Sequence, residues 1–239
     1  SDKAEEKTGP MSELGLSQET IDTAGTTLGV SGANEAKRVQ KEYMQNHRLN
    51  IPTLLMADII HGFRTIFPIP LALGSTWDEA AVEKMAEISA KEAAVSGLHV
   101  TFSPMVDLVR DPRWGRVMES TGEDPLLNSR LAAAMVRGYQ GENLKEDNWR
   151  VAACVKHFAA YGGALAGRDY NTVDMSERQL REMYLPGYKA GLDAGAKLVM
   201  TSFNTVDGIP ATGNQWLFRD VLRNEFGFEG VVISDWGAI

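Results

Sequence analysis

Cysteine and long apolar runs are what this sequence has least of. Its 239 residues include a single cysteine, Cys154, which excludes an internal disulfide and a zinc site built on paired cysteines. No apolar run approaches the roughly 20 residues that a membrane-spanning helix needs, so no membrane partner is expected. Basic residues are in the minority, with 24 Lys and Arg against 32 Asp and Glu and a net charge of −8. This balance argues against nucleic acid as a partner, because phosphate backbones select clustered basic residues.

Motifs for metals and nucleotides are missing as well. The four histidines form neither an i, i+4 pair nor a close cluster of ligands, so no metal site is expected; they are His47, His61, His99 and His157. No G-x-G-x-x-G or Walker motif follows a predicted strand, which argues against a dinucleotide or P-loop fold. The opening stretch SDKAEEKTGP is polar and has no apolar signal core, and residues 1–20 are therefore predicted to form a flexible lead-in.

The chain does contain apolar runs of strand length at regular intervals. They are continuous rather than alternating, which is typical of parallel strands covered on both faces. They span 51–56, 98–102, 151–155, 197–200 and 231–234, with a weaker run near 26–30. Helical patterns separate them, and four polar residues are predicted to begin these helices: Thr76 (with Glu79), Asn128, Ser176 (with Gln179) and Asn214. Alternating strands and helices predict an α/β fold.

Polar residues follow nearly every predicted strand. They are Asp58, Asp107, Lys156-His157, Ser202 and Asp235. Parallel strands that end in charged residues are how a (β/α)₈ TIM-like barrel builds its active site. Five firm strands and one weak one fall short of eight, and the last run is a strand with nothing after it to cover it. The expected fold is therefore an incomplete barrel, truncated before its last strand and helix elements.

Several of these residues have more than one reading. Asp235 is a candidate nucleophile, general base or metal ligand, and equally a helix cap. Lys156 and His157 cannot both point into a barrel from a regular strand, so either one faces the helices or the strand breaks and both turn to its mouth. Lys156 is also a candidate Schiff-base lysine of an aldolase.

A loop rich in arginine and tryptophan completes the set of candidates. Asp111-Pro-Arg-Trp-Gly-Arg116 follows the strand end at Asp107, and it is read either as a structural salt-bridge loop or as a ligand-binding one. Carboxylates, cationic donors and an indole face together suit a polyhydroxylated ring, because the charged groups bind hydroxyls and the indole packs on the apolar face of a sugar.

Six motifs in order give this chain a strong resemblance to a known family. They are Asp58-Ile-Ile-His-Gly62, Asp111 to Arg116, Glu119 to Pro125, Val155-Lys-His-Phe-Ala159, Tyr170 to Ser176 and Ile233-Ser-Asp-Trp-Gly237. From about Asn50 to Ile239 the sequence resembles glycoside hydrolase family 3, in particular its bacterial periplasmic β-glucosidases. The resemblance implies that 21–239 is the N-terminal catalytic barrel and that no cofactor is needed.

The resemblance also implies roles for individual residues. Asp235 resembles the nucleophile that forms the glycosyl-enzyme intermediate of a retaining, exo-acting enzyme. Four residues resemble those that hold the hydroxyls of the −1 sugar, namely Asp58, Arg116, Lys156 and His157, and two more resemble walls beside that sugar, namely Met200 and Trp236. An Asp at position 58 implies glucose rather than xylose, and Phe203 stands where some members have a tyrosine.

Two departures from the family bear on the expected activity. Ala159-Ala-Tyr-Gly-Gly163 replaces the Pro-Gly-His-Gly-Asp sequence of the N-acetylhexosaminidase branch, which disfavours that branch. In the β-glucosidase branch the acid/base Glu comes from a C-terminal α/β sandwich domain that this chain lacks, so the fragment is expected to be nearly inactive alone. A β-glucoside or oligosaccharide is the implied substrate, that domain is the implied partner, and the implied location is periplasmic or extracellular. The alternatives are a non-catalytic carbohydrate-binding barrel and a β-xylosidase of the same family.

Overall fold

The fold is a parallel α/β half-barrel. The computed structural model describes residues 17, 19–20 and 23–239, so the predicted lead-in lies almost wholly outside the described residues. One six-stranded sheet follows the order of the chain and every pairing in it is parallel. Its strands are β1 (Thr26–Leu28), β2 (Leu54–Ala57), β3 (Val100–Thr101), β4 (Ala152–Phe158), β5 (Leu198–Thr201) and β8 (Val231–Ile233). All six predicted runs, including the weak first one, are confirmed as strands.

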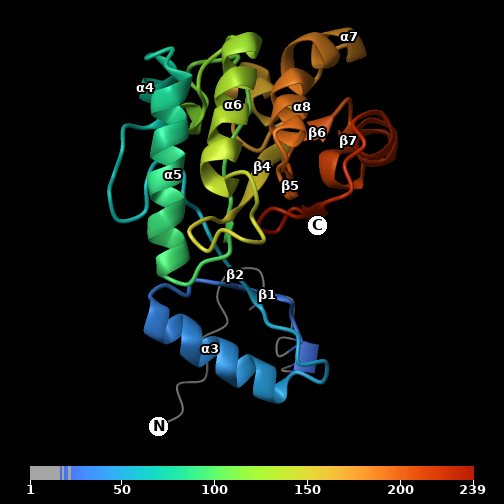
Figure 1. Ribbon diagram of the computed structural model, residues 1–239. Coiled ribbons are helices and arrows are strands. Elements are labelled where there is room, and N and C mark those ends of the chain that lie inside the picture. Colours follow the sequence, from blue (N-terminus) through green and yellow to red (C-terminus); the bar gives the residue numbers. More distant parts are fainter. Residues whose placement is uncertain (1–16, 18, 21–22) are drawn as a thin grey trace.

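Helices connect the strands and cover the outer face of the sheet. They are α3 (Ala33–Asn46), α4 (Pro70–Gly74), α5 (Glu79–Val95), α6 (Pro125–Gln140), α7 (Glu177–Gln179), the π-helical turn η4 (Leu180–Tyr184), α8 (Leu185–Asp193) and the π-helix η6 (Trp216–Glu225). In Figure 1, α5, α6 and α8 stand side by side, and α6 contacts both neighbours. Across the described residues no helix is long and apolar enough to cross a membrane.

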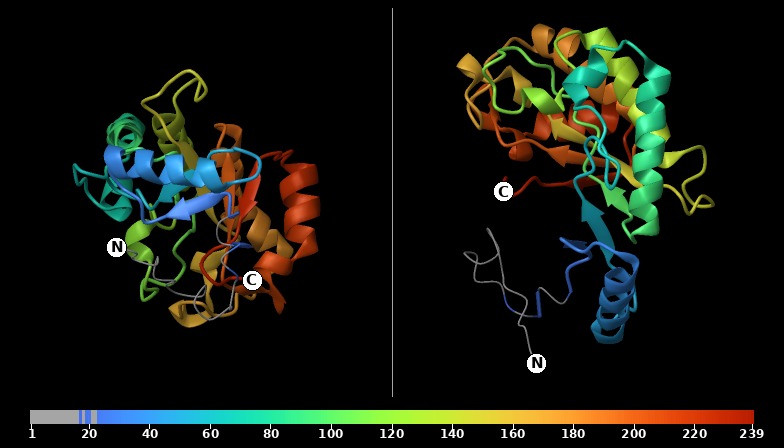
Figure 2. Two further views of the ribbon diagram at one scale, coloured as in Figure 1. Left: turned by 90° about the horizontal axis from the view of Figure 1, so that it is seen from below. Right: turned by 90° about the vertical axis from the view of Figure 1, so that its left-hand side faces the viewer.

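Helix α3 and a short β-hairpin are among the elements that were not predicted from the sequence. Helix α3 lies with β1 at one end of the molecule, away from α6 and α8 (Figures 1 and 2). It buries only Ala36, so it has no wide apolar stripe to reveal it. The short hairpin of β6 (Thr205–Val206) and β7 (Ile209–Pro210) is antiparallel and separate from the main sheet.

The predicted start of α5 is wrong by two residues. Asp78, not Thr76, caps the helix, and its Oδ1 accepts from the Ala81 amide at 3.0 Å. The Thr76 hydroxyl instead donates to the carbonyl of Leu73 at 2.6 Å, so it serves the end of the preceding helix. Its oxygen also accepts from the Asp78 amide at 3.1 Å, which lies before the first residue of α5, so the hydroxyl does not cap this helix and the spacing to Glu79 was misleading.

The predicted start of α6 is also wrong. The helix begins at Pro125, and the carboxylate of Asp124 accepts from the Leu127 amide at 2.7 Å. Asn128 lies inside the helix, where it is buried and donates to the Thr121 hydroxyl at 3.0 Å. Proline at the first position needs no amide partner, which explains why the helix starts one turn earlier.

The other two predicted caps are confirmed. Ser176 Oγ accepts from the Gln179 amide at 3.2 Å, and Asn214 Oδ1 accepts from the Leu217 amide at 3.2 Å. Each side chain satisfies one of the free amides at the start of a helix.

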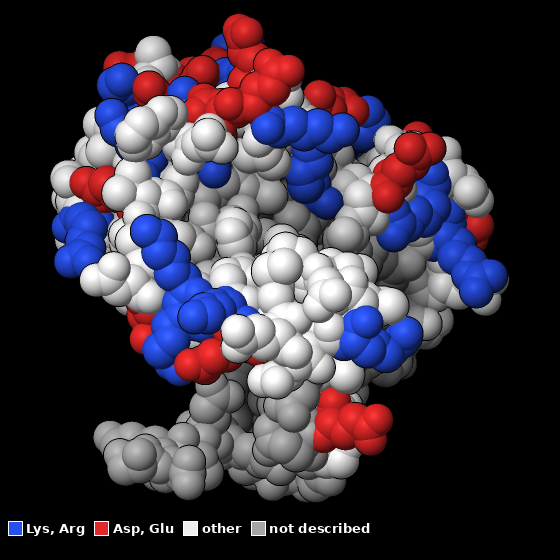
Figure 3. Space-filling view, turned by 60° about the horizontal axis from the view of Figure 1, so that its bottom comes forward, with Lys and Arg blue, Asp and Glu red and all other residues white. Residues whose placement is uncertain are grey.

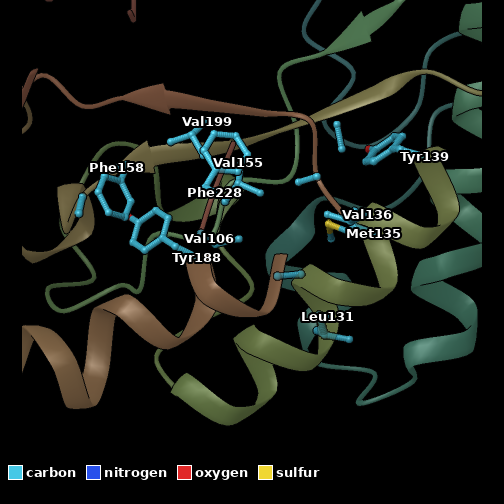
Figure 4. Close-up of a cluster of buried hydrophobic side chains, with 14 of the residues drawn as sticks. Val106, Leu131, Met135, Val136, Tyr139, Val155, Phe158, Tyr188, Val199 and Phe228 are labelled. Atoms are coloured by element: carbon cyan, nitrogen blue, oxygen red, sulfur yellow. The ribbon is translucent and has the colours of Figure 1, made fainter. Parts of the chain in front are cut away.

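The sheet is buried on both faces. Val155 and Val199 pack against α6 and α8 with Val136 and Tyr188 (Figure 4). On the opposite, concave face a second cluster is formed by Met56, Val100, Phe102, Cys154, Leu198 and Met200. Side chains alternate between the two faces along each strand, which is why the strands read as continuous apolar runs. Cys154 belongs to this concave-face cluster and is completely buried.

Candidate active site

The polar residues predicted at the strand ends come together on one side of the sheet. Asp58 follows β2, Lys156 and His157 lie near the end of β4, and Asp235 follows β8. A hollow of about 350 Å³ opens beside them, lined by Asp58, Ile60, His61, Arg116, Met118 and Glu119. The carboxyl ends of parallel strands face the same edge, so the sheet itself brings these distant segments together.

Strand β4 is irregular at its end. Its register against β5 shifts between Val155 and Phe158. Within this irregular stretch Lys156 reaches Asp58 and His157 reaches Asp235, so both side chains turn to the mouth of the half-barrel. Of the two alternatives for this dipeptide, the broken strand is the one found.

Lys156 is a buried cation between two carboxylates. Its Nζ lies 2.9 Å from Asp58 Oδ1 and 3.9 Å from Glu119 Oε2. The Lys156 side chain is 3% exposed, whereas that of Asp58 is 58% exposed. A buried ammonium without a partner would cost several kcal/mol, and the two acidic neighbours offset that cost. The carboxylate of Asp58 therefore faces solvent on one side and a fixed cation on the other.

Arg116 and Glu119 form a two-point ion pair. Arg116 donates from Nε and Nη2 to the two Glu119 oxygens at 2.7 and 2.8 Å, and both side chains are about four-fifths buried. Burial opposes ionisation of Glu119, but the Arg116 hydrogen bond and charge, helped by Lys156 and His157, outweigh it and hold its pKa below the ordinary value. The Arg116 guanidinium also lies over the Tyr161 ring, 5.7 Å from its centroid.

His157 lies between two carboxylates. Its Nδ1 is 2.8 Å from Asp107 Oδ2, and its Nε2 is 3.1 Å from Asp235 Oδ2. The His157 and Asp107 side chains are both fully buried, while that of Asp235 is 15% exposed. Asp107 also accepts the backbone amides of His157 and Tyr161, at 3.0 and 3.2 Å, so it fastens the irregular end of β4 to the loop after β3.

The environment of Asp235 favours its ionised form. Burial raises the pKa of its carboxyl, but His157, the Trp236 amide and the charge of Lys156 outweigh burial and leave that pKa below its usual value. The Trp236 amide donates to Asp235 Oδ1 at 2.6 Å. An anionic, partly exposed carboxylate beside cationic donors is suited to attack an electrophilic carbon.

Aromatic side chains wall one side of these groups. The Tyr161 ring meets the His157 and Trp114 rings edge-on, each at 5.2 Å between centroids. Phe203 lies 5.5 Å from Tyr161, and exposed Tyr170 lies 5.0 Å from Phe203. The rings therefore run from buried Trp114 to the surface at Tyr170, a surface that suits the apolar face of a sugar.

Five predicted residues belong to the charged cluster, and the side chains of the other two take no part in its ion pairs. Asp58 pairs with Lys156 and Asp235 with His157, the next residue along β4, and Arg116 joins Lys156 through Glu119. Met200 is 5% exposed and packs in the apolar cluster of the concave face. Trp236 is 54% exposed. The wall roles of these two residues stay predictions.

The sequence reasoning gave too little weight to Asp107 and Glu119. From the sequence alone, Asp107 is identified only as a strand end and Glu119 only as the first residue of a family motif, but both are buried partners of the site. Glu119 follows Arg116 by three residues on the 3₁₀ turn η1 (Val117–Glu119), a spacing that pairs side chains on one face. This spacing in the sequence could have indicated that Arg116 and Glu119 form an ion pair.

Ligands for a metal do not converge in this region. In the part of the chain that the structure describes, no three His, Cys, Asp or Glu side chains are placed to hold an ion. The face in Figure 3 shows basic side chains in separate groups with acidic ones near several of them, not one continuous basic surface. The chemistry available at the strand ends is thus that of carboxylates, two cations and an imidazole.

A parallel half-barrel with carboxylates and cations at its strand ends is the architecture of a barrel enzyme, whose active site lies at the carboxyl ends of the strands. The chain belongs to glycosyl hydrolase family 3, since residues 21–239 match the model of the family's N-terminal domain. The prediction of this family from the six motifs is confirmed.

Relatives and solved structures agree with this assignment. The chain is 48% identical over 215 residues to the periplasmic β-glucosidase of Salmonella typhimurium, a match that covers 90% of this chain and 28% of that protein. A β-xylosidase of Formosa agariphila is 39% identical over 202 residues, covering 80% of this chain and 28% of the relative. The β-glucosidase of Listeria innocua in complex with isofagomine superposes with a TM-score of 0.94 at 61% identity, covering 97% of this chain and 33% of that one. This chain thus spans about a third or less of each of these proteins.

Proposed function

We propose that this chain is the nucleophile-bearing part of a retaining, exo-acting β-glucosidase. The observation that carries the proposal is the placement of Asp235, an ionised and partly exposed carboxylate held among His157, Lys156 and the aromatic wall. The similarity to the Salmonella and Listeria β-glucosidases supports the same reading. In this proposal the sheet continues into a full (β/α)₈ barrel, and the protein is periplasmic or extracellular.

The proposed reaction has two steps at the anomeric carbon. Asp235 Oδ attacks that carbon, the bond to the aglycone oxygen breaks, and the leaving oxygen takes a proton from a general acid. Water then attacks the anomeric carbon and gives up a proton to the conjugate base of that general acid, while the bond from this carbon to Asp235 breaks, so the sugar is released and the Asp235 carboxylate is restored. Lys156 and Arg116 would donate to the sugar hydroxyls, while Asp58 would accept from them.

The general acid is proposed to come from outside the described residues. Glu119 is a second carboxyl of the cluster, but it is bound at both oxygens by Arg116 and its pKa is lowered. A carboxyl in that state is ionised and has no proton to give, whereas a general acid needs a raised pKa that keeps it protonated. We therefore infer that a C-terminal domain of the same protein supplies the acid/base.

A mechanism-based label tests this proposal directly. The protein, expressed together with the sequence that follows Ile239 in its gene, is treated with a 2-deoxy-2-fluoro β-glucoside, and the labelled peptide is identified by mass spectrometry. The label is expected on Asp235, and Asp235→Asn should abolish it while Asp58→Asn only slows it. A label on another residue would overturn the assignment. Binding of isofagomine without any turnover of aryl glucosides would instead identify a non-catalytic carbohydrate-binding barrel.

A β-xylosidase remains the second candidate, because one relative of this family carries that activity. Rates on aryl β-glucoside and aryl β-xyloside distinguish the two. The exposed carboxylate of Asp58, free on its solvent side, is placed to accept from an extra hydroxyl, so we expect the glucoside to be preferred. An aldolase reaction through Lys156 is disfavoured, because an ammonium between two carboxylates stays charged.

A further inference from the structure

Asp107 is the most fully buried acid of the site, and every polar contact it makes is with a donor. Oδ2 accepts the His157 backbone amide at 3.0 Å, and Oδ1 accepts the Tyr161 amide at 3.2 Å. The Tyr188 hydroxyl lies 2.6 Å from Oδ1 as well. Backbone amides can only donate, so both oxygens act as acceptors, and a carboxyl surrounded by donors in this way is stabilised as a carboxylate. His157 Nδ1, at 2.8 Å from Oδ2, must therefore carry a proton.

The other ring nitrogen of His157 faces a second carboxylate. Nε2 is buried, has no well-aligned hydrogen-bond partner, and lies 3.1 Å from Asp235 Oδ2. The other oxygen of Asp235 accepts from the Trp236 amide. A neutral imidazole protonated on Nδ1 would present the Nε2 lone pair to this anionic oxygen, and the two would repel each other. A proton on Nε2 replaces that repulsion with a charge pair.

The groups that surround the ring are consistent with a positive charge on it. The directly facing residues are two carboxylates from different loops and the rings of Tyr161 and Phe203. Farther out, the Arg116–Glu119 pair is neutral and the charge of Lys156 is offset by Asp58. The set is Asp107, Asp235, Tyr161, Phe203, Tyr188, Lys156, Asp58, Arg116 and Glu119. Burying an imidazolium is costly unless it is paired, and two flanking carboxylates provide that pairing.

We infer that Asp107 is a positioning residue that holds His157 as a doubly protonated imidazolium. The charge of that imidazolium in turn keeps Asp235 an anion. The first part rests on the contacts of the ring with Asp107 and with an ionised Asp235, and the second rests on the proposed function, in which Asp235 is the nucleophile. Asp107 itself touches no reacting atom, because His157 lies between it and Asp235.

Nuclear magnetic resonance of the histidine rings tests the first part without any substrate. Long-range proton–nitrogen spectra of the uniformly ¹⁵N-labelled chain at pH 7 report which ring nitrogens carry protons, and the signals of His157 are assigned from their loss in His157→Gln. Both nitrogens of His157 are expected to be protonated. A single unprotonated nitrogen in the wild-type chain would overturn the inference, whatever the variants do.

Two variants separate the charge of Asp107 from its packing. In Asp107→Asn one ring nitrogen of His157 should lose its proton, because an amide can donate to Nδ1. Tyr188→Phe removes a hydroxyl from the same carboxylate and leaves its charge, so both nitrogens should stay protonated. A ring that stays doubly protonated in Asp107→Asn contradicts the inference.

The pH profile of the enzyme tests the second part. In the protein that carries its downstream sequence, Asp107→Asn should reduce kcat/KM for an aryl β-glucoside by about 10- to 100-fold, the loss typical when a residue that orients a metal-bound imidazole is replaced. The acid limb of its pH profile should move to higher pH, because Asp235 loses a cationic neighbour. Tyr188→Phe should leave that limb in place. An unmoved limb in Asp107→Asn contradicts the link to Asp235, whereas failure to label Asp235 would refute the proposed function and leave the ring spectra unaffected.

Discussion

Lys156 and Asp58 are 98 residues apart in the chain, yet the ammonium of one lies 2.9 Å from the carboxylate of the other. The two ends of this pair differ in their surroundings, since Lys156 is buried and Asp58 is mostly exposed. The Lys156 side chain is enclosed by the protein, while the exposed side of the Asp58 carboxylate can still bind a ligand. The two residues therefore respond differently to substitution.

Asp58→Asn is expected to change binding far more than folding. Exposed ion pairs contribute less than about 1 kcal/mol to the free energy of unfolding, and Lys156 keeps Glu119 as a second acidic neighbour. Urea unfolding should therefore show a loss below about 1 kcal/mol, whereas calorimetry should show weaker binding of isofagomine. A loss of stability as large as that of Glu119→Gln would contradict this division of roles.

Glu119→Gln is expected to destabilise the fold, by about 1–3 kcal/mol, because it leaves Arg116 without its charged partner. The pH dependence follows from the lowered pKa of Glu119. A carboxyl with a depressed folded-state pKa stabilises the protein above its ordinary pKa, 4.5, and that contribution is lost as the pH falls through the folded value. Unfolding measured between pH 7 and pH 3 should show a shallower acid decline for the variant than for the wild type. Equal slopes for the two proteins would show that the Arg116–Glu119 ion pair contributes nothing to the pH dependence of the free energy of unfolding.

Gly162→Ala is expected to destabilise the loop after β4. A Cβ at this position would lie 2.1 Å from the carbonyl oxygen of Leu108, and backbone must shift to admit it, at a cost of about 1–3 kcal/mol. Gly213→Ala is the matched control, because a Cβ there meets nothing within 4 Å. The midpoint of urea unfolding should fall for the first variant and stay close to the wild-type value for the second. Equal midpoints would show that Leu108 moves away freely.

Cys154 is expected to be inert in the folded protein. Its thiol is completely buried in the concave-face cluster, and burial raises its pKa well above the usual range. A disulfide reagent should titrate one thiol per chain in denaturant and react only slowly without it, because reaction requires the thiolate and access to it. Rapid reaction of the native chain would show that the sheet opens at this point.

The strands were predictable because burial on both faces leaves a local mark in the sequence. Val155, Cys154 and Val199 are apolar regardless of which face they take, so a continuous run reveals the strand. Helix α3 was missed for the opposite reason, since it buries only Ala36. The caps at Thr76 and Asn128 were wrong because a neighbouring helix end or a proline had already decided where the helix begins.

The sequence by itself determined the kinds of groups available at the strand ends, and through six ordered motifs it determined the family. Only the tertiary structure decided which of these groups are partners. Asp107 meets His157 across 50 residues, and His157 meets Asp235 across the sheet. Spacing cannot reveal such pairs, because they depend on neighbouring strands bringing their ends to one edge and on the register shift at the end of β4. Burial then turns these contacts into charge pairs, since an ionised group inside the protein must find its partner there.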